Sequence, residues 1–258
     1  MGILNRTPDS FFDQGAYWGF DDFLRKADEL VRAGADLLDV GGVKAGPGDP
    51  VSEQEELDRV VPAIEALRSR FDLPLSIDTW RASVAAACFS AGAVVGNDIS
   101  GFADPDYLTV CARHGASVVA THIRLAPRIP DPEPVYDDLL VDVRSFLEDR
   151  AARAEAAGVD PEAIILDAGL DLGKTEPMSL QLLRSSDRLA ALGYPLLLSA
   201  SNKRFLWDLL GVDRSEAGAG TSAAHALGIS LGCRVLRAHD VRAARRVSDV
   251  MAAILEAA

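Results

Sequence analysis

The stretch Gly2-Ile3-Leu4-Asn5-Arg6-Thr7-Pro8-Asp9-Ser10-Phe11 joins three apolar residues to a polar loop that contains a proline. Such an apolar run predicts a short buried strand that ends at about Asn5. A strand that passes directly into a polar loop is the unit that parallel α/β proteins repeat. The same transition recurs along the chain, and its recurrence indicates the fold class.

Seven further apolar runs end in small, polar or charged residues. These endings are Asp39-Val40-Gly41-Gly42, Ser76-Ile77-Asp78-Thr79, Gly96-Asn97-Asp98-Ile99-Ser100-Gly101, Thr121-His122, Leu166-Asp167, Ser199-Ala200-Ser201-Asn202-Lys203 and Arg237-Ala238-His239-Asp240. Eight strands whose polar ends gather at one rim are typical of a (β/α)8 barrel, in which that rim carries the active site. We therefore predict an α/β fold of the (β/α)8, or TIM-barrel, type.

Segments with helical periodicity separate these strands. Apolar residues recur on one helical face within residues 23–31, 57–67, 139–147 and 247–255. The strand-like runs are too brief and too apolar for half-exposed strands. They lie at residues 73–77, 93–95, 118–120, 164–166 and 196–198. This alternation predicts a parallel sheet buried on both faces. A doubly wound open sheet would alternate in the same way, but polar endings on all eight strands favour a closed barrel.

Length and composition bound the function. A chain of 258 residues suits one barrel, and no linker divides it, so we expect residues 1–258 to form a single domain. With 48% hydrophobic residues the chain can bury a large core. Its 39 acidic and 26 basic residues give a net charge of −13, which argues against nucleic-acid binding. An anionic substrate must therefore be bound by local cations.

Cysteine usage and the N-terminal sequence indicate where the protein works. Cys88, Cys111 and Cys233 are odd in number and lack zinc-site spacing, so we expect reduced core thiols. The chain begins without signal-peptide character, and no apolar run approaches the roughly 18 residues of a membrane span. We expect a soluble, cytoplasmic protein that does not bind membranes.

In order and spacing, six of these motifs resemble the dihydropteroate synthase family. They are Thr7-Pro8-Asp9-Ser10-Phe11, Asp39-x-Gly41-Gly42, Ser76-Ile77-Asp78-Thr79, Asn97-Asp98-Ile99-Ser100-Gly101, Gly173-Lys174-Thr175 and Arg237-x-His239-Asp240-Val241, and the resemblance runs from residue 2 to about residue 245. It implies a folate-pathway transferase that joins a dihydropterin pyrophosphate to p-aminobenzoate or another arylamine and releases pyrophosphate. It also implies a Mg²⁺ cofactor and a homodimer formed through outer helices.

The resemblance assigns site residues by position. The pterin-holding positions of the family match Asp78, Asn97, Asp167 and Lys203. A helix N-cap would be the alternative role for the two aspartates, and a turn the alternative for Asn97. The pyrophosphate positions match Asn5, Arg237 and His239, and Asn5 is also the position that reaches Mg²⁺. Lys203, Arg237 and His239 are thus the predicted catalytic residues, while His122 follows a strand without an obvious partner.

Several positions depart from the family pattern, and most of them belong to the amine subsite. Residues 43–46 read Val-Lys-Ala-Gly where the family carries Glu-Ser-Thr-Arg, so Lys44 leaves one flexible positive charge. Asn202, between Ser201 and Lys203, stands where the family has arginine. We expect Lys44, Ser201 and Asn202 to line a weakened amine subsite. Further departures are Leu172 for an aromatic residue, Thr121-His122-Ile123 for Met-His-Met, and Arg6 for a small apolar residue; with Lys44, Arg6 could add charge for an anion.

These departures leave two functions open. The first is a Mg²⁺-dependent dihydropteroate synthase-like transferase, and the second is a pterin-binding paralogue with little or no such activity. A pterin-dependent methyltransferase on the same barrel is disfavoured, because it would have no use for the Arg237 and His239 pair. Residues 169–175 have one residue too few between the glycines for a nucleotide phosphate loop, so we interpret them as a turn. Lys174 is expected to be buried against a carboxylate, in either a structural or a functional role.

Overall fold

The computed structural model describes residues 1–7, 19–46 and 48–257, so that most of the motif at residues 7–11 lies outside the described residues. The strands are β1 (Gly2–Asn5), β2 (Leu38–Gly41), β3 (Leu75–Asp78), β4 (Val95–Asp98), β5 (Ser117–Thr121), β6 (Ile164–Asp167), β7 (Leu196–Leu198) and β8 (Cys233–Leu236). The helices are α1 (Phe20–Arg32), α2 (Glu53–Arg70), α3 (Ala82–Ser90), α4 (Tyr107–His114), α5 (Leu139–Ala156), α6 (Glu176–Arg184), α7 (Ser186–Ala190), α8 (Arg204–Leu210), α9 (Gly218–Ser230) and α10 (Val241–Glu256). Two short 3-10 helices, η1 (Pro161–Ala163) and η2 (Arg214–Glu216), complete the set.

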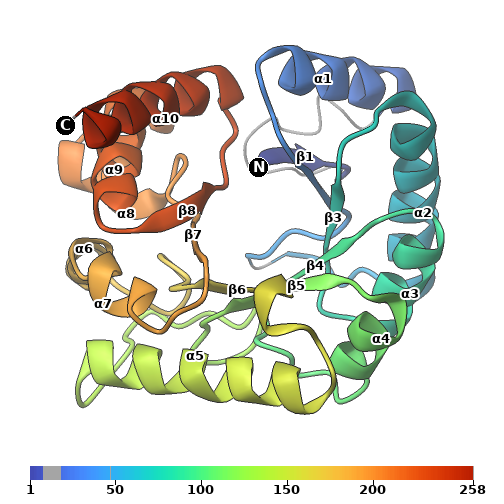
Figure 1. Cartoon of the computed structure of the whole chain (residues 1–258), viewed down its shortest axis with the longest axis horizontal. Helices are drawn as coiled ribbons and strands as arrows, with labels where there is room; N and C mark the ends of the chain where they lie inside the picture. The colour runs from blue at the N-terminus through green and yellow to red at the C-terminus, as the bar shows by residue number, and fades with distance from the viewer. Residues whose placement is uncertain (8–18, 47, 258) are drawn as a thin grey trace.

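The strands form one parallel sheet in the order β1 to β8, and the sheet closes on itself. Backbone hydrogen bonds join its two ends: Ile3 N donates to Ala238 O at 3.0 Å, and Ala238 N donates to Met1 O at 3.0 Å. The helices surround the strands in a ring (Figure 1). The predicted (β/α)8 barrel is confirmed, and the open-sheet alternative is wrong.

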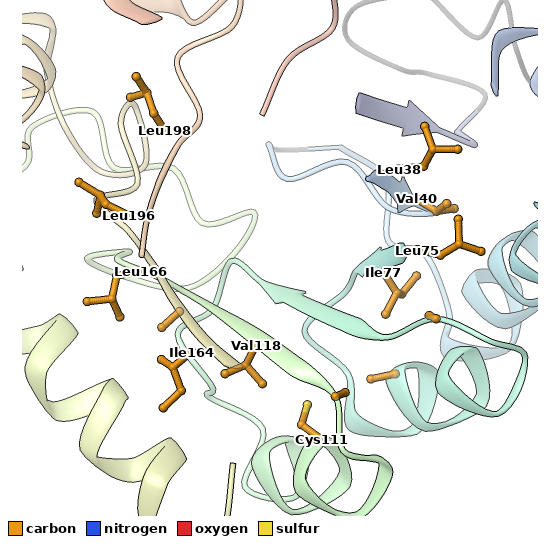
Figure 2. Close-up of a cluster of buried hydrophobic side chains, with 14 of the residues drawn as sticks. Leu38, Val40, Leu75, Ile77, Cys111, Val118, Ile164, Leu166, Leu196 and Leu198 are labelled. Atoms are coloured by element: carbon orange, nitrogen blue, oxygen red, sulfur yellow. The ribbon is translucent and has the colours of Figure 1, made fainter. Parts of the chain in front are cut away.

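The main hydrophobic core lies between the strands and the helices. Leu38, Val40, Leu75 and Ile77 are fully buried there, and Figure 2 shows them on the outer side of β2 and β3. A second, smaller cluster forms around Val95, Val119 and Leu197, which alternate with the outward-facing residues of their strands. Since successive strand residues point to opposite faces, this second cluster fills the inside of the barrel.

The predicted helical faces pack as expected for α1, α2 and α5. Phe23 in α1, Ile64 in α2 and Val143 in α5 are completely buried. In α10, by contrast, Val250, Ile254 and Leu255 are 58%, 59% and 59% exposed. This apolar face of α10 does not pack on the barrel, so an interface between copies is the role that remains open for it, and the homodimer stays a prediction. No helix in the described part of the chain is long and apolar enough to cross a membrane.

The loop after β5 folds over the loop after β2. Arg128 N donates to Ala45 O at 3.2 Å, and Arg128 Nη2 donates to Asp49 O at 2.6 Å. Within the β5 loop, Arg124 donates two hydrogen bonds to the carboxylate of Asp131, at 2.5 and 2.6 Å. Residues 127–132, which include three prolines, therefore form a surface loop that these bonds hold at the rim where the strands end.

Candidate active site

Strand alternation places a layer of polar side chains inside the barrel. Leu38 and Val40 face the helices, so Asp39 and Gly41 face the barrel axis. The register carries this orientation to the neighbouring strands, because Gly41 pairs with Asp78 and Asp78 pairs with Asn97. Polar residues therefore line the carboxyl end of the barrel above the inner apolar cluster.

Asp39 and Arg237 form the centre of this layer. Arg237 Nε donates to Asp39 Oδ2 at 2.6 Å, and its Nη2 donates to Asp78 Oδ2 at 2.7 Å. Asp39 is fully buried and also accepts from Ser76 Oγ at 2.6 Å and from Asn97 Nδ2 at 3.1 Å. Arg237, a predicted pyrophosphate residue, is thus bonded directly to the predicted pterin residue Asp78 and, through Asp39, to Asn97.

Burial and charge proximity shift the pKa values at this centre. Burial raises the pKa of Asp78 to about 7, Arg237 opposes the rise, and the Asp39 carboxylate adds to it. Burial alone would lower the pKa of Arg237, but the Asp39 and Asp78 carboxylates outweigh it and raise that pKa. Arg237 therefore stays charged, while the Asp78 carboxyl can gain or lose a proton near neutral pH.

Asp167 and Lys203 meet around the turn at residues 169–173. Asp167 Oδ1 accepts from Gly169 N at 2.8 Å, and Lys203 Nζ donates to Leu170 O at 2.6 Å. Gly169 has φ +64°, and a Cβ at this position would lie 1.9 Å from His122 O, so the turn requires glycine. Burial raises the pKa of Asp167 and lowers that of Lys203, and their mutual attraction opposes both shifts.

Lys174 anchors the same turn from the other side. Its Nζ donates to Gly169 O and Leu172 O, both at 2.8 Å, and lies 2.9 Å from His122 Nδ1. Burial lowers the pKa of Lys174 to about 7 and that of His122 to about 3. The hydrogen-bond partners of Lys174 are carbonyls and a neutral histidine rather than the carboxylate we expected, and His122 does have a partner.

His239 and Ser201 are joined across the ends of β8 and β7. Ser201 Oγ accepts from His239 N at 3.1 Å and lies 3.1 Å from His239 Nδ1. Burial, followed by the charge of Arg237, lowers the pKa of His239 to about 3. The imidazole is therefore neutral, and the hydroxyl proton of Ser201 is available to Nδ1. If Nδ1 accepts from Ser201, the ring proton sits on Nε2; if Nδ1 donates to Ser201 Oγ, Nε2 is the acceptor.

Asn5 lies close to Asp78 across the small residue between their strands. A Cβ on Gly41 would lie 3.2 Å from Asn5 Oδ1 and 3.8 Å from Asp78 Oδ2. Among the described residues, no three acidic, histidine or cysteine side chains gather to hold a metal ion. The Asn5 amide oxygen alone fits a Mg²⁺ that keeps water ligands and shares phosphate oxygens, because this ion often takes only one or two protein ligands.

Arg6 and Asn202, two residues that depart from the family pattern, have contacts of different kinds. Arg6 stacks over Phe20, with its guanidinium carbon 4.7 Å from the ring centroid, and donates to Arg59 O at 2.6 Å. These contacts engage Arg6 in packing, against the idea that it adds charge for an anion. Asn202 has φ +52°, a left-handed conformation that asparagine tolerates, and its N–H donates to Thr221 Oγ1 at 3.1 Å.

Two cavities flank the barrel. One, of about 370 Å³, lies between the loops after β2, β5 and β6 and is lined by Ala45, Ile123, Ile129, Asp131, Leu172 and Arg204. Leu172, the predicted position of the aromatic wall of the amine subsite, lies in the lining of this cavity. A larger cavity of about 530 Å³, lined by Met1, Leu37 and Val235, lies at the opposite pole and contains none of the predicted site residues.

The structure brings Asp78, Asn97 and Arg237 into one bonded cluster, and neither Asp78 nor Asp167 caps a helix. The sequence interpretation missed the central role of Asp39, which it quoted only as part of a motif. A signal was available, because a carboxylate in the middle of an apolar strand is costly unless it is paired. Asp39 also lies two residues before Gly41 in the same strand, so both residues face the inside of the barrel.

Comparison with known proteins agrees with this architecture. The family model for pterin binding enzymes matches residues 1–239. The chain is 42% identical to dihydropteroate synthase of Bacillus subtilis over 99% of this chain and 88% of the relative, and 43% identical to the inactive dihydropteroate synthase 2 of Mycobacterium leprae over 98% and 89%. The crystal structure of Yersinia pestis dihydropteroate synthase with a sulfonamide drug complex superposes with a TM-score of 0.96 at 38% identity, covering 100% of this chain and 94% of that one. The chain belongs to the family of pterin binding enzymes.

Proposed function

We propose that this chain is a dihydropteroate synthase-like transferase that joins the hydroxymethyl-dihydropterin group of a pterin pyrophosphate to an arylamine. The bond between the methylene carbon and the pyrophosphate oxygen breaks, and its electron pair leaves with pyrophosphate. A carbon–nitrogen bond forms, and the amine gives up a proton. The supporting observation is the cluster in which Arg237 joins Asp39 and Asp78 beside Asn97.

The inner polar layer suits a flat heterocycle with amide and guanidine-like edges. Asn97 and Asp78 lie on adjacent strands, and the Asp167 carboxylate lies across the barrel on β6. Carboxylates and carboxamides bind such edges through paired hydrogen bonds. Lys203 is held by Leu170 O, which directs its ammonium to the same end of the barrel.

The leaving group would be bound by Asn5, Arg237 and His239. Two of the guanidinium nitrogens of Arg237 are engaged by carboxylates, so the side chain offers an anion only its remaining edge. The neutral His239 would bring no charge and, in the tautomer with its proton on Nε2, one N–H donor. When bound, Mg²⁺ would neutralise charge on the pyrophosphate, with the Asn5 side-chain oxygen as its protein ligand.

A second candidate function is pterin binding with little or no dihydropteroate synthase activity. Two observations favour it. The amine subsite has lost the hydroxyls and guanidinium of residues 43–46 and the arginine at position 202. In addition, the relatives from Mycobacterium leprae and Mycobacterium tuberculosis that match this chain at 43% identity are named inactive dihydropteroate synthase 2.

Titration calorimetry followed by a pyrophosphate-release assay separates the two candidates. The transferase proposal expects binding of hydroxymethyl-dihydropterin pyrophosphate with Mg²⁺, and release of pyrophosphate that depends on an added arylamine. Asp167→Asn should weaken pterin binding about tenfold, because a buried partner left unpaired costs about 1–3 kcal/mol. Binding without amine-dependent release supports the second candidate, while unchanged affinity in a folded Asp167→Asn protein contradicts the site.

A further inference from the structure

The buried hydroxyl of Thr121 is an unused polar group at the end of β5. Thr121 is only 2% exposed, and its Oγ1 has no hydrogen-bond partner among the described residues. Buried hydroxyls usually find a partner, because an unsatisfied one loses its hydrogen bonds to water without replacement. The hydroxyl of Thr79, directly after β3 and two strands away, illustrates the usual case, since it donates to Glu56 Oε1 at 2.6 Å.

The register places Thr121 on the inner wall of the barrel. Val119 belongs to the apolar cluster inside the barrel, and Thr121 follows it by two residues, so it has the same orientation. Thr121 also pairs directly with Asp167 on β6. A Cβ on Gly169 would lie 3.3 Å from Thr121 Cγ2, so the methyl group packs against the turn at residues 169–173.

The predicted pterin residues leave a gap that Thr121 fills. Asp78, Asn97 and Asp167 stand at the ends of β3, β4 and β6, with β5 unrepresented among them. Thr121 is the last residue of β5. With it, polar side chains form a continuous arc over four neighbouring strands.

We propose that Thr121 is a specificity-determining residue whose hydroxyl hydrogen-bonds to a polar edge atom of the bound heterocycle. This inference rests on the proposed pterin site and deepens it. A hydroxyl both donates and accepts, so it fits a ring nitrogen, an exocyclic amine or a carbonyl. The family to which this chain belongs usually has methionine here, so the contact would distinguish this chain from its relatives.

The test uses Thr121→Val, which keeps the shape and removes the hydroxyl, and Thr121→Ser, which keeps the hydroxyl. The probe is hydroxymethyl-dihydropterin pyrophosphate with Mg²⁺, measured by titration calorimetry. We expect Thr121→Val to weaken binding about tenfold and Thr121→Ser to retain it within about threefold, as for the loss of one hydrogen bond. Equal affinity of wild type and Thr121→Val would overturn the inference.

Thermal unfolding without ligand provides the second readout. Removing an unsatisfied hydroxyl should raise the Tm of Thr121→Val, whereas the matched variant Thr79→Val, which loses a satisfied one, should unfold at a lower temperature. A lowered Tm for Thr121→Val would show that the hydroxyl has a partner within the protein and would overturn the inference. If the wild type fails to bind the pterin, the proposed function fails, and the sign of this Tm change still decides whether the hydroxyl awaits a ligand.

Discussion

Asp78 is the residue at which protonation and fold are most closely linked. Its folded pKa is raised to about 7, so between its ordinary value and neutral pH the folded protein holds a proton that the unfolded chain has released. The stability that this proton gives is fully present at low pH and is lost as the pH rises through 7. Relative to Asp78→Asn, the free energy of unfolding of the wild type should therefore decrease between about pH 4 and pH 8.

Urea unfolding of both proteins at several pH values measures that difference. The comparison removes the contributions that the two proteins share, such as that of Asp98, whose pKa burial raises to about 6. A difference that stays constant with pH would show that Asp78 is ionised throughout.

Those site residues that lie at the ends of strands could be predicted from the sequence. Asp78, Asn97 and Asp167 follow apolar runs, and strand parity turns them inward. The partners of Arg237 could not be predicted, because 198 and 159 residues separate it from Asp39 and Asp78. Only closure of the barrel brings them together, and no local pattern records that contact.

At the scale of elements, the turn at residues 169–173 depends on a buried lysine. Gly169, Asp171 and Gly173 all have positive φ, and Asp171 is the one of the three that is not glycine. Lys174 offsets the strain through its bonds to Gly169 O and Leu172 O. Its replacement by methionine would leave Leu172 O without this donor and Gly169 O with only the Leu172 N–H, at 3.0 Å, which outweighs the relief of removing a buried charge.

We expect Lys174→Met to lower the free energy of unfolding by about 1–2 kcal/mol, the order of magnitude for one carbonyl that loses its donor and one that loses one of two hydrogen bonds. Amide hydrogen exchange should accelerate at residues 170–173 and stay unchanged in β2 and β3. Lys26→Met, in α1 and away from the turn, is the matched control, because the Lys26 side chain is only 20% exposed and pairs with Glu29 on its own helix; it should alter neither quantity appreciably. Unchanged exchange in the turn would show that Lys174 does not anchor it.

Element boundaries followed from the sequence to different degrees. The apolar run at residues 196–198 coincides with β7, while the run at residues 93–95 marks only the beginning of β4. The difference arises because β4 continues through the polar residues Asn97 and Asp98. Asn97 donates to the distant Asp39, and Asp98 accepts from the nearby backbone N–H of Ser100. The periodicity predicted the helix α10 but not that Val250 and Ile254 are exposed to solvent. An apolar helical face shows that a surface is available for packing, not which surface it packs against.

At the scale of the whole molecule, the polar layer inside the barrel and the outer rim have diverged separately. Three hydrogen bonds join Asp39, Asp78, Asn97 and Arg237 into one cluster. The rim, in contrast, carries Val43 and Leu172 where the family has polar or aromatic groups. The net charge of −13 makes local cations more important, because the surface as a whole repels an anionic amine substrate such as p-aminobenzoate.

This separation predicts low or absent dihydropteroate formation from p-aminobenzoate even when the pterin binds. Loss of orientation of one reactant can remove several kcal/mol of rate enhancement without changing the affinity for the other. A graft of Val43→Glu, Lys44→Ser, Ala45→Thr and Gly46→Arg with Asn202→Arg restores the missing donors. The graft is compatible with the fold in two respects: the Arg128 contacts to this loop use the carbonyls of Lys44 and Ala45, and the left-handed position 202 costs arginine only about 1–2 kcal/mol. Dihydropteroate formation should increase at least tenfold in the graft with pterin affinity unchanged. Efficient synthesis by the unmodified chain would refute the expectation of a weakened amine subsite, because the rim as it stands would then orient the amine.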